Sequence, residues 1–275
     1  AVISVSFASI FIRLCTAPSI VIAFYRLLFA TLILTPITLY RELNELKGLS
    51  RRDTLIMISI GSFLAIHFAF WITSLEYTSV ASSVTLVTTH PLFVCIGAWL
   101  FLHERITPSL LAGIVIAILG CAIIAYGDYG IGGDTLIGDL YALIGAIAAA
   151  IYFICGRNLR QRIGLLPYVT TVYASCTTIL GVSCILMDTP LHPYPVMDYL
   201  LFLALAVVPM IFGHTVLNWA LRHLPASVVS ASVLGEPVGS TMLAAVLLGE
   251  VPSIIVLFGV IVVLCGIYLV SRSIS

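Results

Sequence analysis

The sequence predicts an all-α polytopic membrane protein with ten transmembrane helices, arranged as two inverted repeats of five helices each. Three observations lead to this prediction. Hydrophobic residues make up 61% of the 275 residues and charged residues only 9%, against roughly 45–50% and 25% in soluble domains, so lipid must be the solvent. Apolar stretches long enough to cross a bilayer alternate with short polar breaks. Finally, the second half of the chain repeats a pattern of rare residues from the first half.

The internal repeat is clearest in two apolar helices that we expect at 79–105 and 225–251. Each is interrupted near its middle by a polar residue and a proline, His90-Pro91 in the first and Glu236-Pro237 in the second. Matches between apolar residues are common by chance, so the rare types carry the prediction of two tandem copies. Those that recur at one offset of 146 positions are Pro91 and Pro237, Glu104 and Glu250, Gly113 and Gly259, and Gly120 and Gly266.

The apolar runs divide into a first repeat at 1–126 and a second repeat at 137–271. The first helix is short for a membrane span of about 20 residues. We therefore expect a few natural residues to precede it, and the absence of a charged leader argues against a signal peptide. The predicted helices lie at about 1–16, 18–40, 54–75, 79–102, 108–126, 137–156, 167–187, 198–221, 226–249 and 253–271.

The distribution of Lys and Arg predicts the orientation of the chain in the cytoplasmic (inner) membrane. If ten spans are threaded, the loop cations collect on one side, which the positive-inside rule makes cytoplasmic. The opposite loops carry acidic residues and no Lys or Arg, and the two cations that do not fit, Arg13 and Arg26, belong to the first two helices. Both termini are then cytoplasmic. The cations on the cytoplasmic side are Arg41, Lys47, Arg51, Arg52, Arg105, Arg157, Arg160, Arg162, Arg222 and Arg272.

Five spans per repeat is an odd number, so the second copy must enter the membrane upside down relative to the first. Inverted repeats of this kind place a binding site near the bilayer midplane, between the two halves. His90 and Glu236 are equivalent under the 146-residue offset and lie at mid-helix. Symmetry and depth therefore select the same two residues as candidates for a central site.

Ionisable groups at membrane depth cost roughly 2.5–3.5 kcal/mol at a helix centre, so each needs a reason. Glu236 is a candidate partner for a substrate amine or a proton carrier; alternatively, it is a paired carboxyl that locks two helices. His90 is a candidate for substrate binding or coupling, or it bonds a neighbouring Ser or Thr. Pro91 and Pro237 each remove a backbone hydrogen bond and are candidate hinges. Arg26 cannot lose its proton, so it either binds a substrate carboxylate or forms an ion pair within the bundle.

Five other residues are expected to line the cavity, or to act as interhelical contacts or interface anchors: His67, His214, Asn218, Trp71 and Tyr152. His67 and His214 lie one position out of register in the repeat. Glu104 and Glu250 recur at helix ends beside loops, where a gate or capping role is favoured over substrate binding.

The sequence predicts no metal site, no cofactor and no nucleic-acid partner. The seven Cys are scattered singly with no Cys-x-x-Cys motif, and the net charge is zero. There is no Gly-x-Ser-x-Gly, no His pair at metal-ligand spacing and no phosphate loop, which argues against an enzyme. The expected partners are a small-molecule substrate, the lipid bilayer and a proton if Glu236 carries one, with the chain as a monomer or weak homodimer.

Three segments carry a resemblance to a known family: 18–26 (PSIVIAFYR), 79–105 (ending HPLFVCIGAWLFLHER) and 234–250 (LGEPVGSTMLAAVLLGE). They resemble the EamA family of the drug/metabolite transporter superfamily, over essentially the whole chain. The resemblance implies two EamA repeats of five helices and a metabolite permease, often an exporter of amino acids or related compounds, whose halves rock about a central cavity. The family commonly has a Lys or another polar group where Arg13 stands here.

The sequence thus favours a secondary carrier for a small polar metabolite, working by alternating access. Arg26 and Glu236 offer complementary charges to an amino-acid-like zwitterion. The alternatives are a passive facilitator or channel, a nucleotide-sugar or lipid-linked carrier of the same superfamily, and an intramembrane enzyme.

Overall fold

The structure, a computed structural model, describes residues 1–78, 80–127, 135–247 and 253–272. These residues form helices and connections without a β-strand, so the all-α prediction is confirmed for them. The chain runs through α1 (Val2–Leu14), α2 (Ser19–Arg41), α3 (Leu43–Lys47), α4 (Arg51–Tyr77), α5 (Val80–Val87), α6 (His90–Leu102), α7 (Pro108–Gly127), α8 (Thr135–Arg160), α9 (Leu165–Leu186), α10 (Val196–Leu205), the π-helix η1 (Ala206–Thr215), α11 (Val216–Ala220), α12 (Ala226–Ser232), the 3₁₀ turn η2 (Val233–Gly235), α13 (Glu236–Leu247) and α14 (Ile254–Arg272).

The predicted helix ranges agree with these bounds to within about four residues at each described end. Three of the long rods are built from more than one element: α5 with α6, α10 with η1 and α11, and α12 with η2 and α13. The short helix α3, which follows α2, was not expected. Its five residues Leu43–Lys47 contain no buried side chain.

Six helices in the described part of the chain are long and apolar enough to cross a membrane. Three shorter apolar helices, Val2–Leu14, Pro108–Ile124 and Ile254–Val270, accompany them. The six longer helices are Ser19–Arg41, Arg51–Tyr77, Ser83–Leu102, Leu136–Arg160, Leu165–Leu186 and Val196–Ala220.

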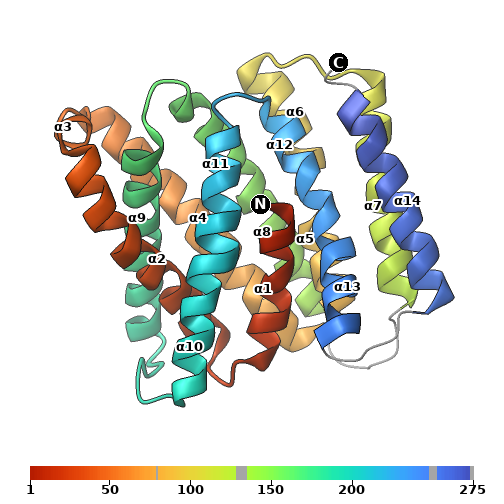
Figure 1. Cartoon of the computed structure of the whole chain (residues 1–275), viewed down its shortest axis with the longest axis horizontal. Helices are drawn as coiled ribbons and strands as arrows, with labels where there is room; N and C mark the ends of the chain where they lie inside the picture. The colour runs from red at the N-terminus through yellow and green to blue at the C-terminus, as the bar shows by residue number, and fades with distance from the viewer. Residues whose placement is uncertain (79, 128–134, 248–252, 273–275) are drawn as a thin grey trace.

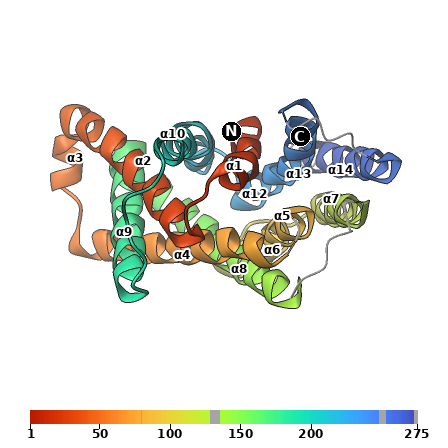
Figure 2. The same ribbon diagram turned by 90° about the horizontal axis from the view of Figure 1, so that it is seen from below.

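The helices form two layers, seen end-on in Figure 2. One layer contains α2, α10, α1, α12, α13 and α14, and the other contains α9, α4, α8, α6, α5 and α7. Each layer thus combines elements from the first and the second half of the sequence. The main apolar core fills the space between α2, α4, α8 and α9, and a second core joins α7 to α14 at one end of the bundle (Figure 1).

Glycines allow α7 and α14 to approach each other closely. A Cβ atom on Gly113 would lie 2.7 Å from the carbonyl oxygen of Gly266, and one on Gly259 would lie 2.9 Å from that of Gly120. Since Gly113 contacts Gly266 and Gly120 contacts Gly259, the two helices run antiparallel. Any larger residue at these positions would push the helix backbones apart.

Candidate functional site

A small pocket lies at the centre of the bundle, between the two layers. Its cavity volume is about 30 Å³, enough for about two water molecules. Side chains from α1, α2, α4, α5, α6, α8, η1, α11, η2 and α13 enclose it, whereas α7 and α14 contribute none. Seven of the eight residues expected to face a substrate line this pocket: Arg26, His67, Trp71, His90, Tyr152, His214 and Glu236.

Arg26 is the most unusual of these residues. Its side chain on α2 is 0% exposed, and none of its three guanidinium nitrogens has a hydrogen-bond partner among the described residues. The guanidinium lies 4.2 Å above the centre of the Phe68 ring, a cation–π contact. A buried guanidinium is normally paired because its desolvation is costly. The pocket therefore presents a permanent cation with free donors.

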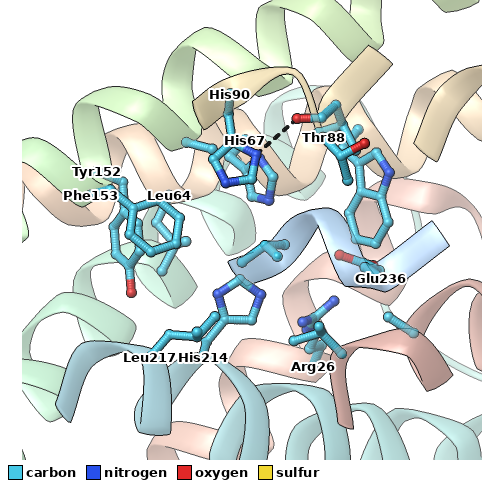
Figure 3. Close-up of a pocket in the computed structure, with 16 residues that line it drawn as sticks. Arg26, Leu64, His67, Thr88, His90, Tyr152, Phe153, His214, Leu217 and Glu236 are labelled. Atoms are coloured by element: carbon cyan, nitrogen blue, oxygen red, sulfur yellow. Dashed lines mark hydrogen bonds between the residues drawn. The ribbon is translucent and has the colours of Figure 1, made fainter. Parts of the chain in front are cut away.

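Glu236 lies on the same pocket and is 7% exposed. In Figure 3, the ends of the Arg26 and Glu236 side chains lie toward the same side of the pocket, away from Tyr152 and Phe153. No ion pair joins Arg26 to Glu236, since the two ion pairs among the described residues are elsewhere. The ion pair that was one of the sequence alternatives for Arg26 is thus not formed in this conformation.

The rods that carry His90 and Glu236 are both interrupted at these residues. His90 is the first residue of α6, after a turn that ends α5, and Glu236 is the first residue of α13, after the 3₁₀ turn of η2. Pro91 and Pro237 follow them in the first helical turn, where a proline without its N–H is well tolerated. The two interruptions are 146 residues apart.

Backbone carbonyls orient two of the histidines. Nδ1 of His90 lies 3.0 Å from the carbonyl oxygen of Val87, the contact dashed in Figure 3, and Nδ1 of His67 lies 3.0 Å from that of Gly145. The sequence favoured a Ser or Thr hydroxyl as the hydrogen-bond partner of His90. Among the described residues, the partner is instead the backbone carbonyl of Val87. The His90 ring also stacks on Phe153, with 5.4 Å between the ring centroids.

His214 reaches the pocket from the end of η1, a ten-residue π-helix with Pro209 inside it. A π-helix bonds i to i+5, so one of its turns holds one residue more than an α-helical turn. The rings of His67 and His214 are tilted by 58° with centroids 6.5 Å apart, and His214 packs edge-on against Phe68 at 5.3 Å.

Asn218, the eighth candidate, lies behind the pocket wall and is 1% exposed. Its Nδ2 donates to the hydroxyl of Tyr152 and, over 2.7 Å, to the carbonyl oxygen of His214. The backbone carbonyl oxygen of Asn218 accepts a hydrogen bond of 3.1 Å from Nε of Arg160. Arg160 was expected among the loop cations, but it is 1% exposed and belongs to α8. Its burial is explained by the backbone carbonyls that accept from its guanidinium.

Carboxylates connect the two halves of the chain by hydrogen bonds at both ends of the bundle. Glu104, after α6, accepts from the backbone N–H of Ala226 at 2.8 Å and from the hydroxyl of Ser227 at 2.8 Å, and so caps α12. At the opposite end (Figure 1), Asp198 of α10 accepts from the N–H of Thr16 at 3.1 Å and from its hydroxyl at 2.8 Å. The other predicted gate or cap, Glu250, lies outside the described residues.

Sequence reasoning missed several residues of the pocket wall. Ala149 and Phe153 share a helix face with the predicted Tyr152, so the i, i+3, i+4 spacing could have identified them. Thr88 lines the pocket beside His90 and had no such signal. No group of three or more His, Cys, Asp or Glu that could hold a metal ion occurs among the residues that the structure describes.

Comparison with known proteins identifies a family and a fold. The model of the EamA-like transporter family matches residues 1–126 and 136–272. An uncharacterized transporter of Archaeoglobus fulgidus is 27% identical over 239 residues, which cover 82% of this chain and 80% of that protein. The uncharacterized transporter YxxF of Bacillus subtilis is 26% identical, over 92% of this chain and 81% of that protein.

Two further similarities are more distant. The UDP-galactose/UDP-glucose transporter 7 of Arabidopsis thaliana is 25% identical over 74% of this chain and 65% of that protein. A solved crystal structure superposes with a TM-score of 0.83 over 99% of this chain and 95% of that chain. Its sequence identity is 16%, so this likeness concerns the fold.

Proposed function

The chain belongs to the EamA-like transporter family of multi-pass membrane proteins, and from this premise we propose that it is a secondary transporter that exports a small zwitterionic metabolite such as an amino acid. The observation that carries the proposal is the unpartnered guanidinium of Arg26 in the same central pocket as Glu236. The substrate carboxylate binds Arg26, and the substrate ammonium binds Glu236. Both contacts are charge-assisted hydrogen bonds, the stronger kind in a dry pocket.

We further propose that ten helices cross the membrane as two inverted repeats, 1–126 and 137–271. The contacts of α7 with α14 support this arrangement, because an offset of 146 residues converts the pair Gly113–Gly266 into the pair Gly259–Gly120. The two layers support it as well, since the 146-residue offset relates each helix of one layer to a helix of the other layer. With the loop cations on the cytoplasmic side, both termini are cytoplasmic and the membrane is the cytoplasmic (inner) one.

Alternating access follows from the size of the pocket. A cavity of about 30 Å³ has no room for an amino acid, so the helices must separate before a substrate can enter. The interruptions before His90 and Glu236, beside Pro91 and Pro237, are the places where the two rods bend as the pocket opens. Rocking of one half against the other then exposes the pocket to each side in turn.

Glu236 also gives the transporter a means of coupling to protons. When the pocket is empty, the carboxyl takes up a proton, and the arriving substrate ammonium replaces it. Substrate and proton then move in opposite directions. Proton-coupled exchange therefore requires the carboxyl of Glu236, whereas carboxylate recognition by Arg26 does not.

Counterflow in proteoliposomes tests this function. Labelled amino acids are exchanged against an unlabelled pool, with and without a pH gradient, for the wild type, Glu236→Gln and the control Glu45→Gln. Glu45 is an exposed residue of α3. We expect saturable, pH-dependent exchange that Glu236→Gln abolishes and Glu45→Gln keeps. Normal transport by Glu236→Gln with unchanged pH dependence would refute the role of Glu236.

A nucleotide sugar is a second candidate substrate, favoured by the similarity to the Arabidopsis UDP-galactose/UDP-glucose transporter 7. A diphosphate is best bound by several cations, and among the described pocket residues Arg26 is the one permanent cation. The pocket therefore suits a single carboxylate better. Exchange of UDP-sugars, but of no amino acid, would reverse this preference, and flux that neither saturates nor exchanges would indicate a passive facilitator or channel.

A further inference from the structure

Three polar side chains of the central pocket donate their hydrogen bonds to backbone carbonyls of the protein. They are His67 of α4, Thr88 in the turn after α5, and His90 of α6. Figure 3 shows these three side chains on one side of the pocket, with Arg26 on the other. We name His67, Thr88 and His90 the acceptor wall, for the reason given below.

The two histidines are fixed in one tautomer by their contacts. A carbonyl oxygen only accepts hydrogen bonds, so Nδ1 must carry the hydrogen in both His67, which donates to Gly145, and His90, which donates to Val87. A second buried cation beside Arg26 would be costly, which favours the neutral imidazole. In a neutral ring with hydrogen on Nδ1, Nε2 has a free lone pair. Nε2 of His90 is buried and has no partner among the described residues.

The hydroxyl of Thr88 is committed in the same way. Its hydrogen is directed to the carbonyl oxygens of Val84 at 2.7 Å and Thr85 at 3.0 Å. Both partners are acceptors, so the lone pairs of Oγ1 remain for donors, and within the protein the Cys121 thiol is in side-chain contact with this hydroxyl. Each member of the acceptor wall thus offers the pocket an acceptor and no hydrogen.

Donors are found elsewhere on the pocket. The guanidinium of Arg26 and the indole N–H of Trp71 are donors only, and their nitrogens are buried without partners in the described part of the chain. A ligand that satisfies all of these groups has one end rich in acceptors and another end rich in N–H or O–H groups. A second carboxylate would face lone pairs at the acceptor wall and be repelled.

We infer that the acceptor wall selects zwitterions whose side chain carries a hydrogen-bond donor, such as a hydroxyl, an amide or an amine, over those with an apolar or acidic side chain. This inference rests on the proposed function, since it names the substrate class of the same pocket. It adds a role for His67, Thr88 and His90 that is separate from the charge pairing by Arg26 and Glu236.

Competition in the counterflow assay tests the substrate class with pairs of similar shape. Threonine is compared with valine, and glutamine with glutamate, as competitors of a labelled amino acid. We expect threonine and glutamine to compete at about tenfold lower concentration than their counterparts, the effect of one buried hydrogen bond. Equal competition within both pairs, with exchange still dependent on Glu236, overturns the inference and leaves the proposed function intact. Exchange of no amino acid overturns both.

Two substitutions of His90 assign the selectivity to its lone pair. His90→Gln keeps an acceptor near Nε2, whereas His90→Phe keeps the ring that stacks on Phe153 and removes the nitrogens. We expect the threonine preference to persist in His90→Gln and to fall to about twofold or less in His90→Phe. An unchanged preference in His90→Phe would contradict the role of His90.

Nitrogen NMR of protein labelled with ¹⁵N-histidine tests the tautomers without any substrate. His67→Gln and His90→Gln assign the two signals by their loss. We expect both rings to carry hydrogen on Nδ1 and none on Nε2. Hydrogen on Nε2 of both rings would refute the acceptor wall, whether or not the protein transports amino acids.

Discussion

The hydroxyl of Thr31 on α2 lies 3.2 Å from the hydroxyl of Thr177 on α9, and the two residues are 146 positions apart. This is the offset that relates Pro91 to Pro237 and Gly113 to Gly259. A residue that touches its own equivalent lies on the axis that exchanges the two halves. Under the proposed inverted repeat, the Thr31–Thr177 contact is therefore the same contact in the inward-open and outward-open states.

A crosslink on this axis is expected to leave transport intact. Thr31→Cys with Thr177→Cys, in a background without the native cysteines, would link α2 to α9 by a disulfide. The link lies where the distance between the two helices is the same in the inward-open and outward-open states. The bond does not oppose rocking because the contact is kept in both states. Counterflow before and after oxidation, with reduction as the reversal, measures the effect.

The matched control is a crosslink away from the axis. Thr16→Cys with Asp198→Cys ties the two halves at one end of the bundle, at the contact of 2.8 Å between their side chains. The offset of 146 residues moves this contact to Arg162 and Arg52, away from Thr16 and Asp198, and Arg162 pairs there with Asp53. The Thr16–Asp198 contact therefore does not lie on the axis. It must open when its own end of the bundle opens, and oxidation should stop exchange. Inhibition by both crosslinks would count against rocking about this axis.

Arg26→Gln is expected to weaken substrate binding while it stabilises the protein. The loss of a charge-assisted bond to the substrate carboxylate corresponds to about 1.5–3 kcal/mol, roughly a 10- to 150-fold rise in the half-saturating concentration. The unpaired guanidinium is 0% exposed, so its removal relieves a desolvation cost and should raise Tm. Counterflow and thermal unfolding in detergent measure the two effects on the same sample.

Arg13→Gln is the matched control, because Arg13 is exposed near the end of α1. Arg13→Gln should change neither the half-saturating substrate concentration nor Tm appreciably. A fall in Tm for Arg26→Gln would indicate that Arg26 has a structural partner, and carboxylate affinity that survives the substitution would end its assignment to substrate binding.

The helices and most of the pocket could be predicted because the sequence signals for them are local or repeated. Apolar runs set the helix bounds, and the paired His90 and Glu236 at mid-helix both line the central pocket. The sequence also gave Arg26 two alternatives, an ion pair or an anion site. Only the placement of α2 against α4 shows that its guanidinium lies over the ring of Phe68.

Two features could not be predicted because they depend on contacts distant in sequence. The π-helix η1 looks like ordinary apolar helix in the sequence. The structure alone shows that His214, near its end, lies with its ring centroid 6.5 Å from that of His67. The burial of Arg160 depends on carbonyls of Asn218 and Ile163 that are free at the ends of their segments. A positively charged residue near a loop is usually solvated, so the sequence predicted a solvated Arg160, whereas its side chain is buried.

Glu104→Ala is expected to destabilise the protein by about 1 kcal/mol, through the loss of the cap on α12. The carboxylate accepts from Ala226 and Ser227 and lies 3.9 Å from Nε of Arg157, so its removal leaves the start of α12 without a partner. Thermal unfolding measures the change. Glu104→Gln keeps one acceptor oxygen and should lose less than half as much, whereas equal losses would show that the charge matters more than the cap.

Substitutions of equivalent glycines should lower the free energy of unfolding by the same amount in the two halves. Gly113→Ala places a Cβ 2.7 Å from the Gly266 carbonyl, and Gly259→Ala places one 2.9 Å from that of Gly120. Overpacking of this kind costs typically 1–3 kcal/mol, because the backbones of α7 and α14 must separate. Leu119→Ala, on the exposed side of α7, is the control and should have a smaller effect. Thermal unfolding that finds one glycine sensitive and its equivalent tolerant would contradict the symmetric packing on which the inverted repeat depends.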